Sequence, residues 1–416
     1  MVEALALAGG ARAVARCDAL REAPYSDMEG GLFRAYLTPA YAAAQEVLAG
    51  WMEAAGMAVR RDEAANLIGR YEGECADAPA LMIGSHLDSV RDGGPYDGPL
   101  GIMLGVECAA ALHARGRRLP FAIEVYAFGD EEGSRFPAAM LTSRAVAGTL
   151  LPDALDIQDG DGVSLAEAGV DPAAYLGARR MPGSILAYLE AHIEQGPVLE
   201  AKGLALGTVT GIAAQLRYAV CVKGQAGHAG TSAMPLRRDP LPGAAEMVLA
   251  AETIARGDAS DAVATVGRIE ALPGAPNVIA GEVRFTLDVR AGDSARRDRV
   301  AGAILERIDQ IADARGLDCS IECIHDLPPS PCDPALMDLM DGALEDAGQP
   351  VFRLVSGAGH DAMNMAALCP TAMLFIRCKG GISHNPAEHV EPEDADAALR
   401  VMLGFIDRLG ERHNAC

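Results

Sequence analysis

The sequence predicts an α/β protein with a mixed, largely parallel sheet, flanking helices and a smaller inserted unit. Short apolar runs alternate with helical stretches at both ends of the chain, which is typical of a parallel sheet. Between residues 209 and 327 the order changes to βαββαβ, a complete small unit of antiparallel type. The chain has 416 residues, enough for two domains, since single cores stop growing at roughly 250–300 residues.

The first part of the large domain, residues 1–208, contains a helix predicted over 38–56. Thr38 can cap this helix, Pro39 suits its first turn and Gly56 can end it. The alternating strands and helices that follow are predicted at 80–85, 99–115, 121–129 and 136–148. Because ligands gather at the carboxyl ends of parallel strands, polar residues that follow the strands should meet at one edge of the sheet.

The inserted unit, residues 209–327, is predicted from alternating strands and two long helices. Its strands and helices are expected, in βαββαβ order, at 214–224, 239–257, 262–272, 281–292, 294–316 and 317–327. The proline-rich stretch LPPSPCDP then indicates a linker, and helix and strand alternation resumes over 328–416. The economical interpretation is one α/β domain built from both ends of the chain, with a second domain inserted.

Charge and composition argue against several classes of partner. The formal net charge is −23, whereas nucleic acids and anionic membranes are bound by basic surfaces. No apolar run approaches the roughly 20 residues of a membrane span, and the N-terminal stretch lacks the basic start of a secretory signal. We therefore expect a cytoplasmic protein. Its ten cysteines form no CxxC pair and are expected to be buried thiols rather than ligands or a disulfide.

The stretch GSHLDSVRDGGPYDGPLG, residues 84–101, places one histidine and three aspartates among five glycines. Glycine is kept where a chain bends sharply or approaches something closely, and His and Asp are metal-ligand types. Asp88 lies two residues after His86, so on a strand-like segment it could hold the imidazole tautomer. The alternative is an ordinary surface loop with a solvated histidine, and this stretch alone does not decide between them.

Further polar groups lie in comparable places: Glu131 and Glu132 in DEEGSRF, His192 in AHIEQGP and His384 in GGISHNPAE. Each has a simple explanation by itself, because adjacent glutamates usually form a solvated face and a loop histidine is usually a surface group. Together with His86 and Asp97 of the first stretch they match what two adjacent metal ions need. That set is a bridging carboxylate, further nitrogen and oxygen ligands, and a carboxylate that accepts a proton.

On these motifs the chain resembles the binuclear-metal amidohydrolases related to aminoacylase and the dimetal carboxypeptidases. Within them it is most similar to the branch of allantoate amidohydrolase, N-carbamoyl-L-amino-acid hydrolase and β-ureidopropionase. The resemblance rests on eight motifs in order: GSHLDSV…GGPYDGPLG, DEEGSRF, AHIEQGPVLE, GIAAQLRY, GHAGTSAMPLRRD, PNVIAGEVRFTLDVR, SGAGHDA and GGISHNPAEHV. It implies a zinc-aminopeptidase-like catalytic domain and a ferredoxin-like inserted domain that acts in dimerisation and as a lid.

Carried over position by position, the resemblance implies two divalent metal ions per subunit. The ligands would be His86, Asp97 and His192 for one ion, and Asp97, Glu132 and His384 for the other. Asp97 would bridge the two ions, Asp88 would support a ligand, and Glu131 would be the general base. Manganese is favoured, with zinc, cobalt or nickel possible, because nitrogen and oxygen ligands accept all of these metals.

In the inserted domain, the resemblance implies that His228 reaches the active site of the partner subunit in a homodimer and stabilises an oxyanion. Asn277 and Arg290 would hold the substrate carboxylate, since the planar guanidinium binds a carboxylate with two hydrogen bonds. Gln215 would be a further polar contact. Without the resemblance, a surface salt bridge at a strand end is the simpler interpretation of Arg290. No role is assigned to three further residues: Arg217, His360 and Arg377.

The implied activity is metal-dependent hydrolysis of a ureido C–N bond in a small-molecule ureido acid. The stretch MLFIRCKGGISHNPAEHV favours allantoate, which would give ureidoglycine, ammonia and carbon dioxide. N-carbamoyl-L-amino-acid hydrolase or β-ureidopropionase would use the same machinery with a different pocket. A dimeric metal-binding scaffold without turnover is a third alternative, against which Glu131 argues, because a binder needs no spare carboxylate beside its ligands.

Overall fold

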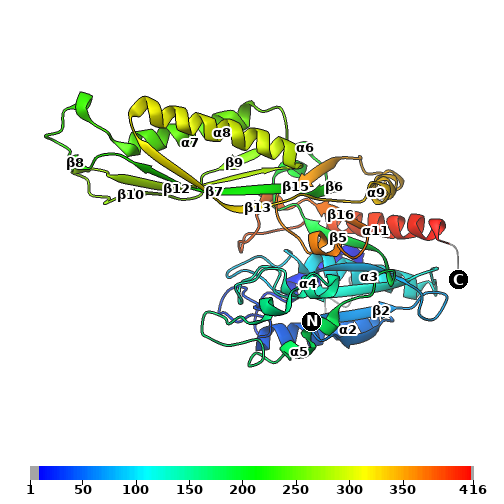
Figure 1. Cartoon of the computed structure of the whole chain (residues 1–416). Helices are drawn as coiled ribbons and strands as arrows, with labels where there is room; N and C mark the ends of the chain where they lie inside the picture. Colours follow the sequence, from blue (N-terminus) through cyan, green and yellow to red (C-terminus); the bar gives the residue numbers. More distant parts are fainter. Residues whose placement is uncertain (1–8, 414–416) are drawn as a thin grey trace. The chain divides into compact units, whose positions relative to one another are not determined.

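The computed structural model describes residues 9–413, which divide into two compact units. Unit 1 comprises the chain up to Thr210, Cys332–Leu354 and the chain from Gly359 onward. Unit 2 comprises Gly211–Pro331 and Val355–Ala358. Figure 1 shows how the helices and strands of each unit follow the chain from its N-terminal to its C-terminal end. No helix within residues 9–413 is long and apolar enough to cross a membrane.

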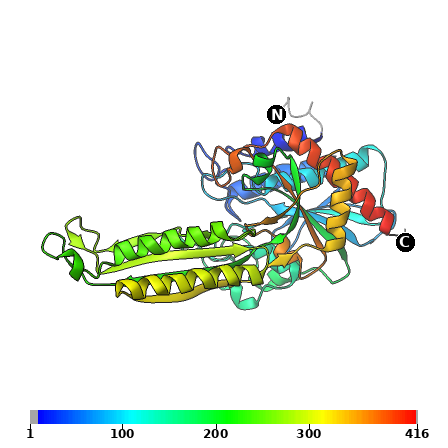
Figure 2. The same cartoon turned by 90° about the horizontal axis from the view of Figure 1, so that it is seen from above.

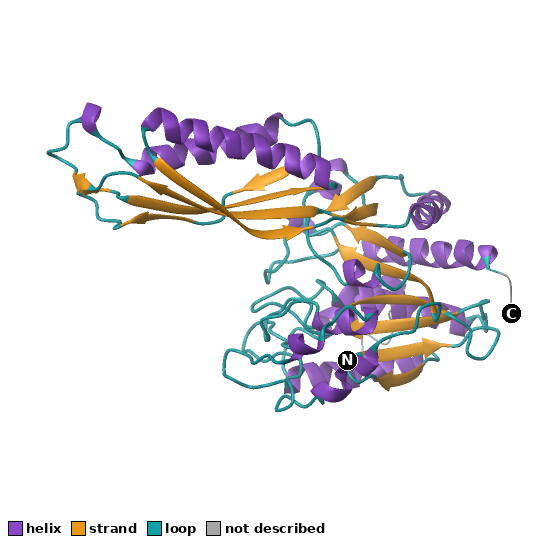
Figure 3. Ribbon diagram, in the orientation of Figure 1, coloured by secondary structure: helices purple, strands orange, loops and turns teal. Residues whose placement is uncertain are grey.

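A nine-stranded sheet carries several of the predicted metal ligands on its strands and the loops that follow them (Figure 3). Its strands, in spatial order, are β1 (Ala58–Arg61), β2 (Leu67–Tyr71), β4 (Ala122–Phe128), β3 (Ala80–His86), β5 (Ile185–Ile193), β16 (Thr371–Ile376), β6 (Leu206–Ile212) and β14 (Ser330–Pro331), with β15 (Arg353–Ser356) on β6. The four adjacent strands β4, β3, β5 and β16 are parallel, whereas β1, β2, β6 and β14 pair antiparallel with their neighbours. The predicted mixed, largely parallel sheet is confirmed.

The parallel strands are buried along their length, as expected where helices cover both faces of a sheet. All seven residues of β3 and all seven of β4 are buried. The longer helices of unit 1 are α1 (Gly9–Ala19), α2 (Pro39–Ala54), α3 (Pro99–Ala114), α9 (Pro334–Asp346) and α11 (Pro392–Arg412). Helix α2 begins as predicted, because the Thr38 hydroxyl accepts a hydrogen bond from the Tyr41 amide at 3.3 Å.

Shorter helices connect these elements: α4 (Leu141–Ala147), α5 (Pro172–Tyr175), α6 (Val198–Lys202) and α10 (Ala362–Met365). The prediction of a helix from residue 136 is wrong for its first turn. Met140 has φ +58°, so the backbone is left-handed there and the helix starts one residue later.

Unit 2 has an antiparallel sheet with two long helices on one face (Figures 1 and 2). Its main elements are β7 (Ala214–Lys223), α7 (Pro240–Gly257), β9 (Val263–Thr265), β10 (Ile269–Leu272), β12 (Glu282–Ala291), α8 (Ser294–Arg315) and β13 (Asp318–Leu327). The strand order is β10-β12-β7-β13, with β9 also on β12. The strand predicted over 262–272 is therefore two short strands. A separate two-stranded ribbon joins β8 (Gly227–His228) to β11 (Val278–Ile279).

The core of unit 2 explains its strand pattern. Alternate residues of β12, from Val283 to Ala291, are buried, and they pack with Ile304 and Ile308 of α8. Strand β13 is less buried than β12, and its Cys323 is exposed. The expectation of buried thiols is thus wrong for Cys323, and it is wrong for Cys75, which is disulfide-bonded.

Candidate metal centre

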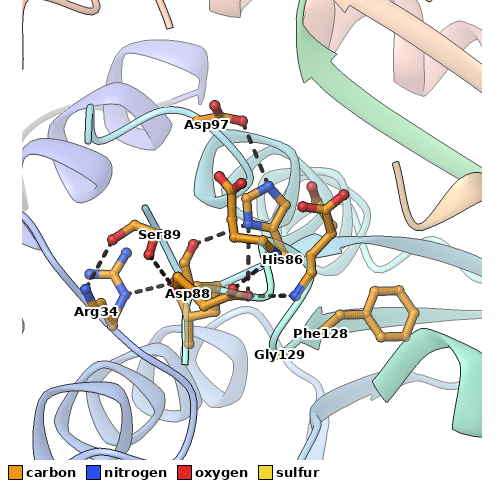
Figure 4. Close-up of polar contacts among 12 residues, drawn as sticks. Arg34, His86, Asp88, Ser89, Asp97, Phe128 and Gly129 are labelled. Atoms are coloured by element: carbon orange, nitrogen blue, oxygen red, sulfur yellow. Dashed lines mark hydrogen bonds and ion pairs between the residues drawn. The ribbon is translucent and has the colours of Figure 1, made fainter. Parts of the chain in front are cut away.

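The loop between β3 and α3 turns back on the strand from which it came. His86 is the last residue of β3, and Asp97 lies two residues before α3. Gly98 has φ +86°, and a Cβ on it would lie 2.4 Å from the carbonyl oxygen of His86. Only glycine fits this left-handed and crowded position. The return path brings Asp97 Oδ1 to 3.6 Å from His86 Nε2 (Figure 4).

Asp97 lies between two groups of predicted ligands. Its Oδ1 is 3.1 Å from His192 Nε2, on the same side as His86. Its Oδ2 is 3.2 Å from His384 Nε2, and the same nitrogen is 3.3 Å from Glu132 Oε1. The structure therefore brings together both predicted ligand sets, and each could hold one ion. One carboxylate with an oxygen toward each group is the arrangement that a bridging ligand requires.

Unpartnered atoms show that these residues fit a metal. Asp97 Oδ1 and His192 Nε2 are buried and lie 3.1 Å apart, but neither has the geometry of a hydrogen bond, with the other or with any residue within 9–413. A buried polar atom without a partner is unfavourable, so a partner of another kind is expected here. Imidazole nitrogens with carboxylate oxygens form a donor set that suits manganese, zinc, cobalt or nickel.

The two buried histidines present the correct nitrogen to this centre. His86 Nδ1 lies 3.0 Å from the carbonyl oxygen of Asp88, and His192 Nδ1 lies 2.9 Å from that of Ile193. An Nδ1–H that donates to a carbonyl leaves the Nε2 lone pair free for a metal. His192 does not follow a strand, as the sequence suggested, but lies within β5, so the strand itself sets its direction.

The role predicted for the Asp88 side chain needs correction. Its carboxylate is 3.9 Å from His86 Nδ1, so the carbonyl rather than the side chain orients the imidazole. The carboxylate instead accepts hydrogen bonds from the backbone amides of Glu131 at 3.2 Å and Glu132 at 3.3 Å. Asp88 thereby ties the loop after β4 to the end of β3.

Electrostatics in the centre follow from burial and from this crowding. Burial alone would raise the pKa of Asp97, but the facing histidines hold it well below its usual range. Asp97, together with Glu132, raises the pKa of His384 to about 10. Burial raises the pKa of Glu131 well above its usual range. Glu131 is thus a buried carboxylate with a raised affinity for protons.

Three residues around the centre carried no signal strong enough to select them from the sequence: Glu190, Gln195 and Glu388. Gln195 Nε2 donates to Asp97 Oδ2 at 2.8 Å, from a backbone with φ +55°. Such strain in a residue other than glycine is typical of functional sites. Glu190 accepts hydrogen bonds from Ser85, Tyr188 and the Ala362 amide.

A third group of possible metal ligands consists of Glu190, His192 and His360. Both oxygens of Glu190 already accept hydrogen bonds, and His192 belongs to the first predicted set. The buried ring of His360 packs edge-on against His192 with centroids 4.5 Å apart, and burial lowers its pKa well below its usual range. Arg377 pairs with Asp394 through two hydrogen bonds of 2.9 Å.

In unit 2, Arg290 and Gln215 are direct partners across β12 and β7. Both bind Asp288, which the sequence analysis did not select: Arg290 Nε lies 2.8 Å from Oδ1 and Gln215 Nε2 lies 2.5 Å from Oδ2. Arg217 donates to the same Oδ2 at 3.1 Å. The guanidinium of Arg290 is thus held in one orientation, with Nη1 donating to the carbonyl of Gly357.

His228 and Asn277 lie together at the ribbon of β8 and β11. The Ala229 amide donates to the carbonyl oxygen of Asn277 at 3.0 Å, and the His228 side chain is exposed. In Figure 1 this ribbon continues past the end of the five-stranded sheet at which β7 ends and β12 begins. The β7–β12 register runs from the Gln215–Arg290 pair to the Lys223–Glu282 pair. At about 3.3 Å per residue, His228 and Asn277 are therefore more than about 25 Å from Arg290.

Comparison with known proteins identifies the family of this chain. Residues 82–408 match the peptidase family M20/M25/M40. The N-carbamoyl-L-amino acid amidohydrolase of Geobacillus stearothermophilus is 42% identical over 386 residues, which cover 92% of this chain and 94% of the relative. The allantoate deiminase of Arabidopsis thaliana is 40% identical, with 95% and 81% covered.

A solved structure gives the same result for the fold. The crystal structure of a hydantoinase/carbamoylase family amidase from Burkholderia multivorans superposes with a TM-score of 0.88 at 35% identity. The match covers 96% of this chain and 97% of that one. With relatives this similar over almost its whole length, the chain belongs to the peptidase family M20/M25/M40.

Proposed function

We propose that this protein is a metal-dependent amidohydrolase that cleaves a ureido C–N bond, with allantoate as its best substrate. The observation that carries the proposal is Asp97, whose two oxygens face two separate ligand groups beside the buried Glu131. Family membership supports the hydrolase class. Relatives named for allantoate and for N-carbamoyl-L-amino acids support a ureido substrate.

The metal ligands are proposed as two sets that share Asp97: His86 and His192 on one side, Glu132 and His384 on the other. Two divalent ions bound there would polarise the substrate carbonyl and acidify a water molecule. Asp88 holds the backbone of Glu131 and Glu132 through their amides.

The side chains of the protein then move the proton and bind the substrate. Glu131 accepts a proton from the attacking water, whose oxygen forms a bond to the carbamoyl carbon. The C–N bond breaks as Glu131 returns the proton to the leaving nitrogen. His228 stabilises the negative charge on the carbonyl oxygen. Arg290 and Asn277 bind the substrate carboxylate, with Gln215 as a further polar contact.

The arrangement of unit 2 supports a homodimer, given the substrate contacts proposed above. His228 and Asn277 are more than about 25 Å from Arg290 and Gln215, which is farther than a small ureido acid can span. One substrate can meet all four residues only if two chains contribute them. We therefore propose a two-fold dimer in which each site takes His228 and Asn277 from the partner subunit.

The substrate is tested by ammonia release from allantoate, N-carbamoyl-L-amino acids and 3-ureidopropionate, assayed side by side with added manganese. We expect allantoate to be hydrolysed fastest and chelated protein to be inactive. The N-carbamoyl-L-amino acids are the second candidate, because the Geobacillus relative carries that name. Faster turnover of an aliphatic N-carbamoyl amino acid would overturn the choice of allantoate, and no turnover of any substrate would favour a metal-binding scaffold.

A further inference from the structure

We propose that Glu388 is a positioning residue that fixes the backbone of Asp97 and thereby sets the affinity of the protein for its metal pair. The inference rests on the metal centre proposed above. Glu388 is 3% exposed, and its Oε1 accepts two backbone hydrogen bonds, from Tyr96 at 2.8 Å and from Asp97 at 3.0 Å. One buried oxygen thus holds the amide of the candidate bridging ligand.

The loop is shaped to receive this side chain. A Cβ on Gly94 would lie 2.3 Å from the Cβ of Glu388 and 2.5 Å from its Oε1. No real Cβ comes that close, so the glycine at 94 exists because Glu388 fills the space beside it. The loop is held a second time at Tyr96, whose hydroxyl donates to Asp18 at 2.9 Å.

An ordinary ion pair does not explain why Glu388 is buried. Its Oε2 is buried without a hydrogen-bond partner, and it forms no salt bridge with any residue that the structure describes. The carboxylate contacts backbone amides instead of a cation. Leaving two buried amides without an acceptor would be unfavourable, so the pair of hydrogen bonds is what keeps the side chain in place.

The position of Glu388 in the sequence links two ligands of the centre. It lies four residues after His384, and its amide donates to the carbonyl oxygen of Asn385 at 3.0 Å, which closes a turn between them. One short segment therefore supplies a ligand of one metal group and the clamp on the ligand shared by both groups. Metal–ligand distances can vary by only about 0.2 Å. Fixing the Asp97 backbone from this segment therefore keeps Asp97 Oδ2 at the distance from His384 that a shared metal ion requires.

The test compares manganese binding by calorimetry in the full-length metal-free protein and its variants. We expect Glu388→Ala to bind manganese roughly 10–100-fold more weakly, the usual loss when a partner of a ligand is removed. Glu388→Gln keeps an acceptor oxygen and should bind close to wild type. Gly94→Ala keeps the carboxylate but displaces it, so it should also weaken binding.

A matched control is Asp333→Ala. Asp333 also accepts two backbone amides, from Ala335 at 2.9 Å and Leu336 at 3.0 Å, at the start of α9 and away from the ligands. This variant should lose thermal stability and keep its manganese affinity. Melting curves identify any variant that does not fold. If Glu388→Ala fails to fold, the manganese affinities of Gly94→Ala and Glu388→Gln are compared instead, and weaker binding by Gly94→Ala alone supports the inference.

Two results would overturn the inference. Wild-type affinity for two ions in both Glu388→Ala and Gly94→Ala would show that the clamp does not matter. Equal weakening of manganese binding in Glu388→Gln and Glu388→Ala would show that the negative charge of Glu388, and not its hydrogen-bond acceptor, determines the affinity. Failure of the wild-type protein to bind two ions would instead contradict the proposed metal centre, so the two failures are distinguishable.

Discussion

Buried carboxylates around the metal centre have two kinds of partner. Asp97 faces imidazole nitrogens, whereas Asp88 and Glu388 accept hydrogen bonds from backbone amides of the loops that carry the ligands. We propose that the first kind contacts a metal and that the second kind fixes where the ligand loop lies. Substitutions of the two kinds should therefore differ in their effects on metal content, turnover and stability.

Glu131 and Glu132 are adjacent, but removing the charge of each should affect a different property: turnover for Glu131 and metal binding for Glu132. We expect Glu131→Gln to retain two metal ions and lose about 10²–10⁴-fold in turnover, the usual value of general-base assistance. Glu132→Gln should lose metal, because Glu132 Oε1 lies beside His384. Metal analysis and kcat on the same samples check this. If both variants behave alike, the assignment of the pair is wrong.

Asp288 should make unit 2 sensitive to acid. Burial opposes ionisation, but Arg290 and Gln215 together hold the pKa of Asp288 below its usual value. A carboxyl with a lowered folded-state pKa stabilises the protein above its unfolded pKa of about 3.9 and loses this contribution as pH falls through the folded value. The difference in melting temperature between wild type and Asp288→Asn should thus shrink below about pH 4. A difference that stays constant with pH would contradict the argument.

Helix α3 packs on β5 through a glycine. A Cβ on Gly101 would lie 2.1 Å from the carbonyl oxygen of Ala191, the residue before His192. We expect Gly101→Ala to lower the free energy of unfolding by about 1–3 kcal/mol, because the helix must move off the strand. Denaturant unfolding measures this loss, and Asp97, which precedes α3, should bind metal less well.

The control for this change is Gly50→Ala in the middle of α2. A Cβ on Gly50 meets nothing within 4 Å. Alanine should therefore be neutral or add up to about 1 kcal/mol of stability through its helix propensity. Equal losses in both variants would show that the contact between α3 and β5 is not tight.

The elements predicted well from the sequence are those whose residues are uniformly apolar or clearly capped, such as β3, β4 and α2. The sequence pattern of β5 indicated a strand less clearly, because Glu190 and His192 interrupt its apolar residues. Both side chains are buried at the candidate metal centre. The candidate metal ligands could be selected by their motifs. Glu388 could not, because its partner Asp97 is 291 residues away and no local pattern marks such a pair.

At the scale of the whole molecule, we predict from the proposed dimer that two inactive variants regain activity when they are mixed. His228→Ala and Glu131→Ala should each be nearly inactive alone. After random subunit exchange half the dimers are mixed, and each mixed dimer has one site with both defects and one with neither. Activity should then recover to about a quarter of wild type.

The control for complementation is a mixture kept from exchanging subunits, for example by crosslinking each variant first. It should stay inactive, and recovery there would indicate contamination. No recovery after exchange has been demonstrated by mass spectrometry would mean that His228 acts within its own chain or has no catalytic role.

The pairing of β6 with β14 affects which insertions and deletions the chain can accept during evolution. Gly211 and Pro331, the first and last residues of the long segment of unit 2, are register partners in these two strands. The segment therefore leaves and returns at one point, like a long hairpin loop, and the strands on either side need not move when its length changes. Units that enter a chain in this way are readily inserted, lost or exchanged. The large sheet with its candidate metal ligands and the inserted unit can thus evolve as separate modules. The first would keep the chemistry, while changes in the second would alter substrate choice.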